Sequence, residues 1–298
     1  MTHFTPLTEA EIAALRLERL ARARDDRAIN ENAPPIAHVE DVVAPAGTGV
    51  RCRLYLPVRH RSLPLLIYAH GGGWAFGSLD SHDRLLRQLA ISCEIAVLSV
   101  DYRLSPEHPF PAARDDLIAV VHTIRARRCL LNNLKAGSLF VGGDSAGAHI
   151  ALSAALQLEP GTIDGAFLFY GAFRPGFTAT SHASFGSGEF GLSTADMKRY
   201  WAAYLNSASH HICEKANLLA QDLHNLPNMY IEAAQLDPLL SDSLELAEAL
   251  RCLHVTCECT VSNGMHHGYL RHFETTIEAR VHFRRLTGFL KSCAAGSR

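Results

Sequence analysis

The sequence predicts an α/β fold in which helices cover both faces of a mostly parallel sheet. Short, continuous apolar runs recur along the chain, and each is typical of a strand buried on both faces of a sheet. They occupy residues 64–69, 95–100, 138–141, 166–170 and 229–234. Helix-like stretches separate these runs, and this alternation predicts parallel crossover connections. The 298 residues, 48% of them hydrophobic, suffice for a large core.

The first part of the chain precedes this alternation. Thr8 and Glu11 have the spacing of a capping box, and the partly apolar face that follows predicts a helix over residues 8–26. Residues 36–43 and 50–56 predict two strands of a hairpin, with one face in water because apolar and polar residues alternate in the second. The remaining helices are expected at 80–92, 112–128, 146–158 and 239–252, followed by a last strand at 255–261 and a last helix at 273–291.

Residues 173–222 interrupt the alternation. They contain no strand-like run, but a Gly- and Ser-rich stretch at 181–191 is followed by a helix-like stretch at 194–205. An insertion of this length after a sheet strand predicts a lid. Because no linker-like segment breaks the pattern, we expect a single domain over residues 1–298.

Composition and charge exclude several classes of protein. The net charge of −2 gives no reason to expect a nucleic-acid partner or an anionic membrane. The eight cysteines are scattered and form no CxxC pair, which suits a reducing compartment. The N-terminal residues lack the pattern of a secretory signal, and no apolar run is long enough to span a bilayer. We therefore expect a cytoplasmic protein without stable membrane insertion.

Residues 143–147 read Gly-Asp-Ser-Ala-Gly and lie between a predicted strand and a predicted helix. The pattern G-x-S-x-G in this position is typical of a nucleophile elbow, a sharp turn that exposes the serine hydroxyl. Glycines flank the serine because a side chain would collide within the tight turn. The helix N-terminus behind it favours negative charge. Ser145 is the predicted nucleophile.

Residues 70–74 read His-Gly-Gly-Gly-Trp and directly follow a predicted strand. Glycines leave backbone N–H groups free to point at a substrate oxygen, so Gly71, Gly72 and Gly73, together with Ala146, are candidates for an oxyanion hole. A phosphate-binding loop is the alternative. The segment lacks the lysine of a P-loop, and its glycine spacing misses the dinucleotide-binding pattern.

A serine nucleophile needs a base, and the base needs an orienting carboxylate, in the chain order serine, acid, histidine. Asp237 follows the strand-like run at 229–234, with the alternative role of capping the next helix. His266 and His267 both follow the last predicted strand, and the residues themselves leave the choice between them open. No HExxH or Cys/His ligand spacing is present, so we expect neither a metal nor a cofactor.

Four stretches together resemble the hormone-sensitive-lipase-like family of α/β-hydrolases, in particular its bacterial acetyl esterases and carboxylesterases. They are HGGGW at 70–74, DYRLSPEHPFPAA at 101–113, GDSAG at 143–147, and the pairs Asp237-Pro238 and His267-Gly268. The resemblance covers roughly residues 50–290 and implies an α/β-hydrolase fold. That fold has a mostly parallel eight-stranded sheet, flanking helices and a helical cap, formed here by about residues 1–35 and 173–222.

The resemblance also implies a catalytic machinery. The triad would be Ser145, Asp237 and His267, since the family reads HG followed by an aromatic residue at the histidine. The oxyanion donors would be the backbone N–H groups of Gly72, Gly73 and Ala146. The substrate would be a small short-chain acyl ester, cleaved through an acyl-enzyme without a cofactor. An amidase or formamidase with the same triad, or a non-catalytic small-molecule receptor on this fold, remains an alternative.

Further expectations concern the surroundings of the site. The candidates for the walls of a substrate pocket are Trp74, Phe76, Phe185, Phe190 and Leu192. For each of them, packing in the lid or the core is the alternative. A homodimer through the last strand and helix is a further prediction.

Three residues near the motifs are given supporting roles. Arg103 and Glu107 are expected to pair beneath the site, and Asp144 to buttress the elbow through backbone hydrogen bonds. Tyr269 stands where the family more commonly has Phe, which leaves the chemistry unchanged.

Overall fold

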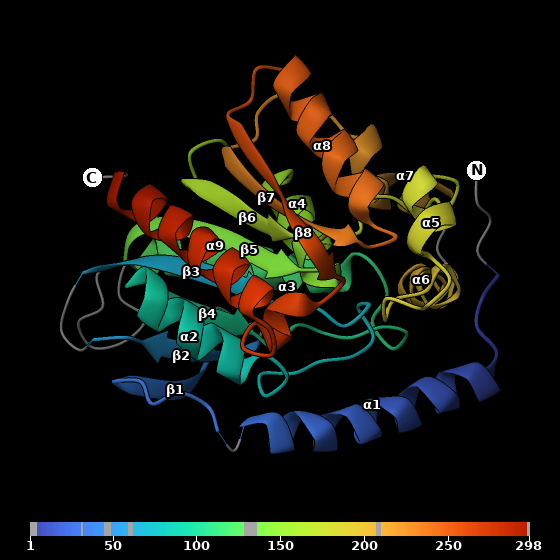
Figure 1. The fold of residues 1–298 in the computed structure, drawn as a ribbon, viewed down its shortest axis with the longest axis horizontal. Coiled ribbons are helices and arrows are strands. Elements are labelled where there is room, and N and C mark those ends of the chain that lie inside the picture. The colour runs from blue at the N-terminus through green and yellow to red at the C-terminus, as the bar shows by residue number, and fades with distance from the viewer. Residues whose placement is uncertain are drawn as a thin grey trace.

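The computed structural model describes residues 5–30, 32–44, 49–58, 62–127, 136–206 and 210–296. Within them, eight strands form one sheet in the order β1-β2-β4-β3-β5-β6-β7-β8 (Figure 1). The strands are β1 His38–Val43, β2 Arg51–Leu56, β3 Leu63–Ala69, β4 Ala96–Val100, β5 Ala136–Asp144, β6 Gly165–Phe169, β7 Asn228–Leu236 and β8 Cys257–His266. Only the pairs β1–β2 and β2–β4 are antiparallel, so the predicted mostly parallel α/β sheet is confirmed.

Helices cover both faces of this sheet (Figure 1). α2 (Asp83–Cys93) and α9 (Ile277–Gly296) pack on one face, and α3 (Ala112–Arg127), α4 (Ala146–Ala155) and α8 (Leu240–Cys252) on the other. Successive strand residues point to opposite faces. Leu66 accordingly belongs to the cluster under α2 and α9, whereas Ile67 belongs to the larger cluster on the other face. Burial on both faces explains why the central strands read as continuous apolar runs.

The N-terminal helix α1 spans Glu9–Asn30 and begins at the predicted capping box. The backbone N–H of Thr8 donates to Glu11 Oε2 at 2.8 Å, and the N–H of Glu11 donates to Thr8 Oγ1 at 3.3 Å. In Figure 1, the N-terminal half of α1 passes beneath α5, α6 and α7 at one end of the sheet. The ion pair between Glu18 and Arg199, 2.8 Å long, joins α1 to α6.

The insertion at 173–222 is helical. It holds α5 (Thr180–Phe185), α6 (Thr194–Tyr204), α7 (His210–Ala216) and the 3-10 turn η1 (Leu218–Ala220). The helix predicted over 194–205 is confirmed as α6, which begins with a capping box between Ser193 and Asp196. That the insertion and α1 act together as a cap over bound substrate stays a prediction.

Several helix and strand boundaries differ from those predicted. The last residue of the helix predicted at 112–128 lies outside the described residues. β8 continues past the predicted strand 255–261 to His266, and α9 begins at Ile277 because η2 (Tyr269–His272) precedes it. Apolar runs mark only the buried part of a strand, whereas backbone pairing with β7 continues through polar residues. No helix of the described ranges combines the length and apolarity that crossing a bilayer requires.

Candidate active site

Ser145 occupies the turn between β5 and α4, with φ 54° and ψ −119°, a strained conformation for a residue with a side chain. Its backbone N–H donates to the carbonyl of Phe169 on β6 at 2.8 Å. A Cβ on Gly143 or Gly147 would lie 2.3 Å or 2.0 Å from the carbonyl oxygen of Ala69 on β3. The flanking glycines are therefore required by the close passage of a neighbouring strand.

Two side chains complete a hydrogen-bonded line from this serine. His267 Nε2 lies 2.8 Å from Ser145 Oγ, and His267 Nδ1 lies 2.7 Å from Asp237 Oδ2. The second oxygen of Asp237 accepts the N–H of Leu239 at 2.8 Å, immediately before α8. Asp237 therefore satisfies both interpretations made from the sequence, since it faces the imidazole and also binds backbone at the helix start.

The structure brings His267, and not His266, to the serine. His266 is exposed, and its Nδ1 lies 2.9 Å from the carbonyl oxygen of His267. The ring of Tyr170 meets the His267 imidazole edge-on, with centroids 5.1 Å apart. Tyr170 has φ 37°, which is unusual for a bulky residue, and it directly follows β6. No sequence motif pointed to this contact.

The glycine loop presents free amides beside Ser145. Gly72 and Gly73 have φ of 131° and 56°, which favour glycine. Within the described part of the chain, the N–H groups of Gly72, Gly73 and Ala146 donate to no protein acceptor. The amide of Ala146 opens α4, where no intrahelical acceptor exists. Gly71 departs from the prediction, because its N–H already donates to Asp144 Oδ1 at 2.9 Å.

The sequence predicted that Asp144 supports the elbow. Its side chain instead binds the glycine loop, through the N–H of Gly71. Its buried carboxylate accepts from the Tyr68 hydroxyl at 2.8 Å as well as from Gly71, and His82 Nε2 lies 3.0 Å from it. Burial by itself would raise the pKa of Asp144, but His82 and Tyr68 hold it well below its ordinary value. His82 was missed because no local pattern places it beside residue 144.

Two of the predicted pocket walls are part of the packed interior. Trp74 stacks on Tyr204 with ring centroids 4.4 Å apart, and Phe76 meets Tyr200 edge-on at 5.7 Å. Both Trp74 and Phe76 are about 1% exposed, so neither faces open space. Both side chains pack against α6, which agrees with their alternative interpretation as packing residues.

The other three candidates lie in the insertion. Phe185 and Phe190 contact one another, with centroids 5.9 Å apart, and both are half-buried. Leu192 is half-buried against the main hydrophobic cluster. Their role as pocket walls stays a prediction.

The expected pair between Arg103 and Glu107 is wrong. Arg103 pairs instead with Asp116 on α3 at 2.8 Å, and Glu107 pairs with Arg16 and Arg19 of α1 at 2.9 Å and 3.0 Å. Arg19 and Glu107 are 88 positions apart along the chain, so no local sequence pattern could have predicted their pairing. Among the described residues, no three His, Cys, Asp or Glu side chains gather as metal ligands would.

Comparison with known proteins agrees with this geometry. Residues 66–271 match the model of a protein family described as having the alpha/beta hydrolase fold. This chain belongs to that α/β-hydrolase family. The resemblance to the hormone-sensitive-lipase-like family is thereby confirmed.

Solved structures extend the comparison of this α/β-hydrolase to more than nine-tenths of the chain. A hyperthermophilic esterase from the archaeon Pyrobaculum calidifontis is 28% identical with a TM-score of 0.86, covering 97% of this chain and 99% of that one. A thermostable carboxylesterase cloned from a metagenomic library is 27% identical with a TM-score of 0.86, covering 94% and 97%. An α/β-hydrolase from the metagenome of Lake Arreo, Spain, is 29% identical with a TM-score of 0.82, covering 92% and 89%.

Proposed function

We propose that this α/β-hydrolase is a serine carboxylesterase that cleaves small esters of short-chain acids through an acyl-enzyme. The observation that carries the proposal is the continuous line from Ser145 Oγ to His267 and on to buried Asp237. The nucleophile lies within hydrogen-bond distance of the base, and the base lies within hydrogen-bond distance of the orienting carboxylate, as acyl transfer requires. The esterases and carboxylesterase among its structural relatives support the ester-hydrolase class.

The first half-reaction forms the acyl-enzyme. His267 Nε2 accepts the proton of Ser145 as Oγ attacks the ester carbonyl carbon, and Asp237 stabilises the imidazolium that forms. The carbonyl oxygen becomes an oxyanion that accepts hydrogen bonds from the free amides of Gly72, Gly73 and Ala146. The C–O bond of the ester then breaks, and His267 returns the proton to the leaving alcohol.

The second half-reaction regenerates the enzyme. His267 accepts a proton from water, whose oxygen attacks the acyl carbon, and the same three amides bind the second oxyanion. The bond to Ser145 Oγ breaks, Oγ takes the proton back, and the carboxylic acid leaves. His267 must therefore be neutral at the start of each half-reaction, when it accepts a proton.

The preference for short acyl chains has support from packing beside the glycine loop. Trp74 packs against the rings of Trp201 and Tyr204, with centroids 4.3 Å and 4.4 Å away, and His149 of α4 meets it edge-on at 5.3 Å. This buried aromatic cluster fills the space between the loop, α4 and α6, which argues for a confined acyl site. Cytoplasmic location and a homodimer stay predictions from the sequence.

The test is hydrolysis of p-nitrophenyl acetate, butyrate and decanoate by the wild type and by Ser145→Ala. We expect turnover of the short esters and a loss of about 10⁴–10⁶-fold in kcat for the variant, with an unchanged circular dichroism spectrum. The control is Ser292→Ala, at an exposed position of α9 outside the proposed site, which should retain full activity. Faster cleavage of a p-nitroanilide than of the esters would favour the amidase, and binding without turnover would favour the receptor.

A further inference from the structure

Helix α1 is held to the rest of the chain mainly by polar groups. Leu15 is buried, but Leu17 and Leu20 are 69% and 62% exposed, so the helix offers little apolar surface for docking. Its polar contacts are spread along its length. They join Arg16 and Arg19 to Glu107, Glu18 to Arg199, Arg22 to Tyr200, Asp26 to Arg271, and Asn30 to the Asp80 carbonyl.

A further contact of α1 reaches the residue that directly follows the glycine loop, residues 70–74. Arg19 Nε donates to the carbonyl oxygen of Ala75 at 2.8 Å, two residues after Gly73. Arg19 Nη2 donates to the carbonyl oxygen of Ser105 at 2.8 Å, and the N–H of Ser105 donates to the carbonyl oxygen of Trp74 at 2.9 Å. A single guanidinium therefore binds the backbone next to Gly72 and Gly73, two of the three proposed oxyanion donors.

A second contact reaches the same loop through side chains. The guanidinium of Arg22 lies 4.1 Å from the ring centroid of Phe76 and donates to the hydroxyl of Tyr200 at 3.2 Å. The Tyr200 ring lies against Gly73, because a Cβ there would be 2.5 Å from Tyr200 Cγ. Arg22 of α1 thus contacts the tyrosine that packs against Gly73, which presents one of the free amides.

A third contact reaches the loop that carries the base. Asp26 Oδ1 and Arg271 Nη2 are 2.5 Å apart, and Arg271 lies in η2, four residues after His267. Asp26 is largely buried at this contact. The same helix therefore binds both loops whose relative positions set the proposed site.

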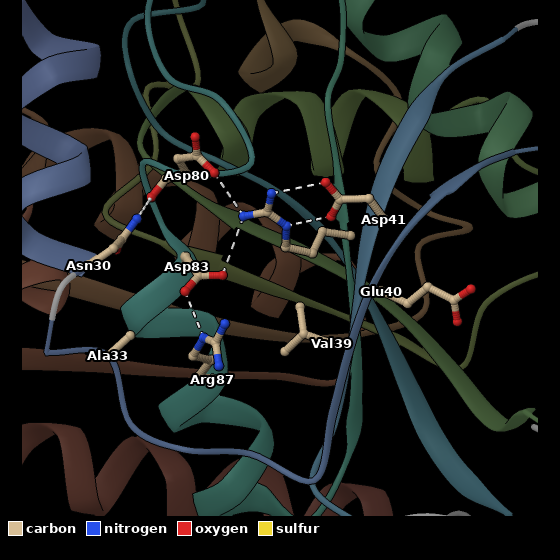
Figure 2. A pocket seen from close by; sticks show the side chains of 9 residues that line it. Asn30, Ala33, Val39, Glu40, Asp41, Asp80, Asp83 and Arg87 are labelled. Atoms are coloured by element: carbon tan, nitrogen blue, oxygen red, sulfur yellow. Dashed lines mark hydrogen bonds and ion pairs between the residues drawn. The ribbon is translucent and has the colours of Figure 1, made fainter.

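The C-terminal end of α1 is anchored separately, in the open groove of Figure 2. Asn30 Nδ2 donates to the carbonyl oxygen of Asp80 at 2.7 Å, and the Asp80 carboxylate pairs with Arg53 at 2.8 Å. Arg53 also pairs with Asp41 on β1 at 2.5 Å. This end of α1 is therefore linked to the sheet by contacts of its own, separate from those in the middle of the helix.

We propose that α1 is a charge-held strap and that Arg19 and Asp26 are positioning residues, which couple docking of the helix to the geometry of the glycine loop and of the His267 loop. The proposal rests on the proposed function of the site. Salt screens the more exposed pairs of α1, those of Arg16 with Glu107 and of Glu18 with Arg199, because the Debye length falls from about 10 Å at 0.1 M to about 3 Å at 1 M. The largely buried pair of Asp26 and Arg271 is screened much less. Ionic strength therefore controls how firmly the strap holds the catalytic groups.

The first test measures kcat and KM for p-nitrophenyl acetate between about 0.05 M and about 1 M NaCl, a range over which screening lengths change severalfold. We expect kcat of the wild type to fall about threefold to tenfold with salt, with a smaller change in KM, because misplaced catalytic groups slow the chemical step. Arg19→Gln should show the lower kcat already at low salt and respond less to further salt, whereas Asp26→Asn should show a lower kcat at every salt concentration. Arg24→Gln, at an exposed position of the same helix, should behave as the wild type.

A charge reversal separates positioning from general damage to the fold. Asp26→Arg and Arg271→Asp should each lower kcat, and the double variant should recover most of it because the pair is restored with its charges exchanged. Recovery in the double variant supports the proposal. Single variants with the kcat of the wild type, or a double variant no better than either, would overturn it.

Two further readouts do not depend on ester turnover. Trypsin should cleave α1 faster at high salt and in Asp26→Asn, and a fluorophosphonate should label Ser145 more slowly under the same conditions. Unchanged labelling despite faster cleavage would show that the strap opens without positioning the site, and would overturn the proposal. A wild type that is labelled in this pattern but hydrolyses no ester would contradict the proposed function and leave the strap standing.

Discussion

Leu236 of β7 and His266 of β8 are register partners in a parallel pair. The next residue on each strand is therefore brought to the same edge of the sheet, and Asp237 and His267 form their 2.7 Å contact there. The contact arises from where two neighbouring strands end, which is the place where functional groups collect in open α/β sheets.

The carboxylate of Asp237 should be essential for ester hydrolysis, whereas the protein should still fold without it. We expect Asp237→Asn to lower kcat for p-nitrophenyl acetate by about 10⁴-fold, because the amide no longer holds the imidazole in the tautomer that accepts the serine proton. Steady-state kinetics measure the effect. The matched control is Asp222→Asn, an exposed aspartate that pairs with His224 at the surface. A loss below about tenfold would remove Asp237 from the proposed triad.

The glycines of the elbow should be far less replaceable than a glycine in a helix. A Cβ at Gly147 would lie 2.0 Å from the Ala69 carbonyl oxygen, whereas a Cβ at Gly288 in α9 meets nothing within 4 Å. We expect Gly147→Ala to destabilise the fold by about 2 kcal/mol or more, since backbone must move. Gly288→Ala should stabilise it by about 0.5–1 kcal/mol. Urea unfolding compares the two, and equal effects would contradict the role of close strand passage in shaping the elbow.

Arg53 should contribute more to stability than its neighbour Arg51 on the same strand. Arg53 is 18% exposed and pairs with Asp41, Asp80 and Asp83, the three aspartates labelled in Figure 2. Arg51 is 72% exposed and pairs with Asp101 alone among the described residues. We expect Arg53→Met to cost about 2–4 kcal/mol, because carboxylates of a partly buried network lose their counter-charge.

The control, Arg51→Met, should cost at most about 1 kcal/mol, as for an exposed pair. Thermal and urea unfolding of both variants give the comparison. Similar losses for the two would show that the network in the groove adds nothing beyond a surface ion pair.

Asp242 should make the fold less stable as pH rises. Burial raises the pKa of Asp242 to about 7, although Arg174 and the amide of Phe173 act in the opposite direction. An unfolded aspartate titrates at about 3.9, so between these values the folded state holds a proton that the unfolded state has released. Stability from this group is therefore full below about pH 4 and is lost as pH rises through about 7.

Asp242→Asn removes this titration and keeps an acceptor for the Phe173 N–H, which lies 2.9 Å from Asp242 Oδ2. The variant should gain about 1–3 kcal/mol relative to the wild type between about pH 5 and pH 8, measured by urea unfolding at each pH. A relative loss over that range would mean that the folded state favours the carboxylate anion paired with Arg174.

The order of strands and helices was predictable because each element carries its own local signal. Apolar runs such as 64–69 mark the buried strands, and Thr8 with Glu11 marks the start of α1. The elbow at Ser145 was predictable for the same reason, since the tight turn imposes glycines on its own neighbours. Strand boundaries in polar stretches, such as the end of β8, were not predictable, because backbone pairing leaves no side-chain pattern there.

By itself, the sequence determined the α/β alternation, the serine at its sharp turn and the glycine loop, because each is specified by residues adjacent in the chain. Only the tertiary structure decided that the amide of Gly71 binds Asp144 and that Glu107 pairs with Arg19 and not Arg103. Each of these depends on the packing of segments far apart in the sequence, and a hydrogen bond or ion pair is fixed by distance in space, on which local patterns carry no information.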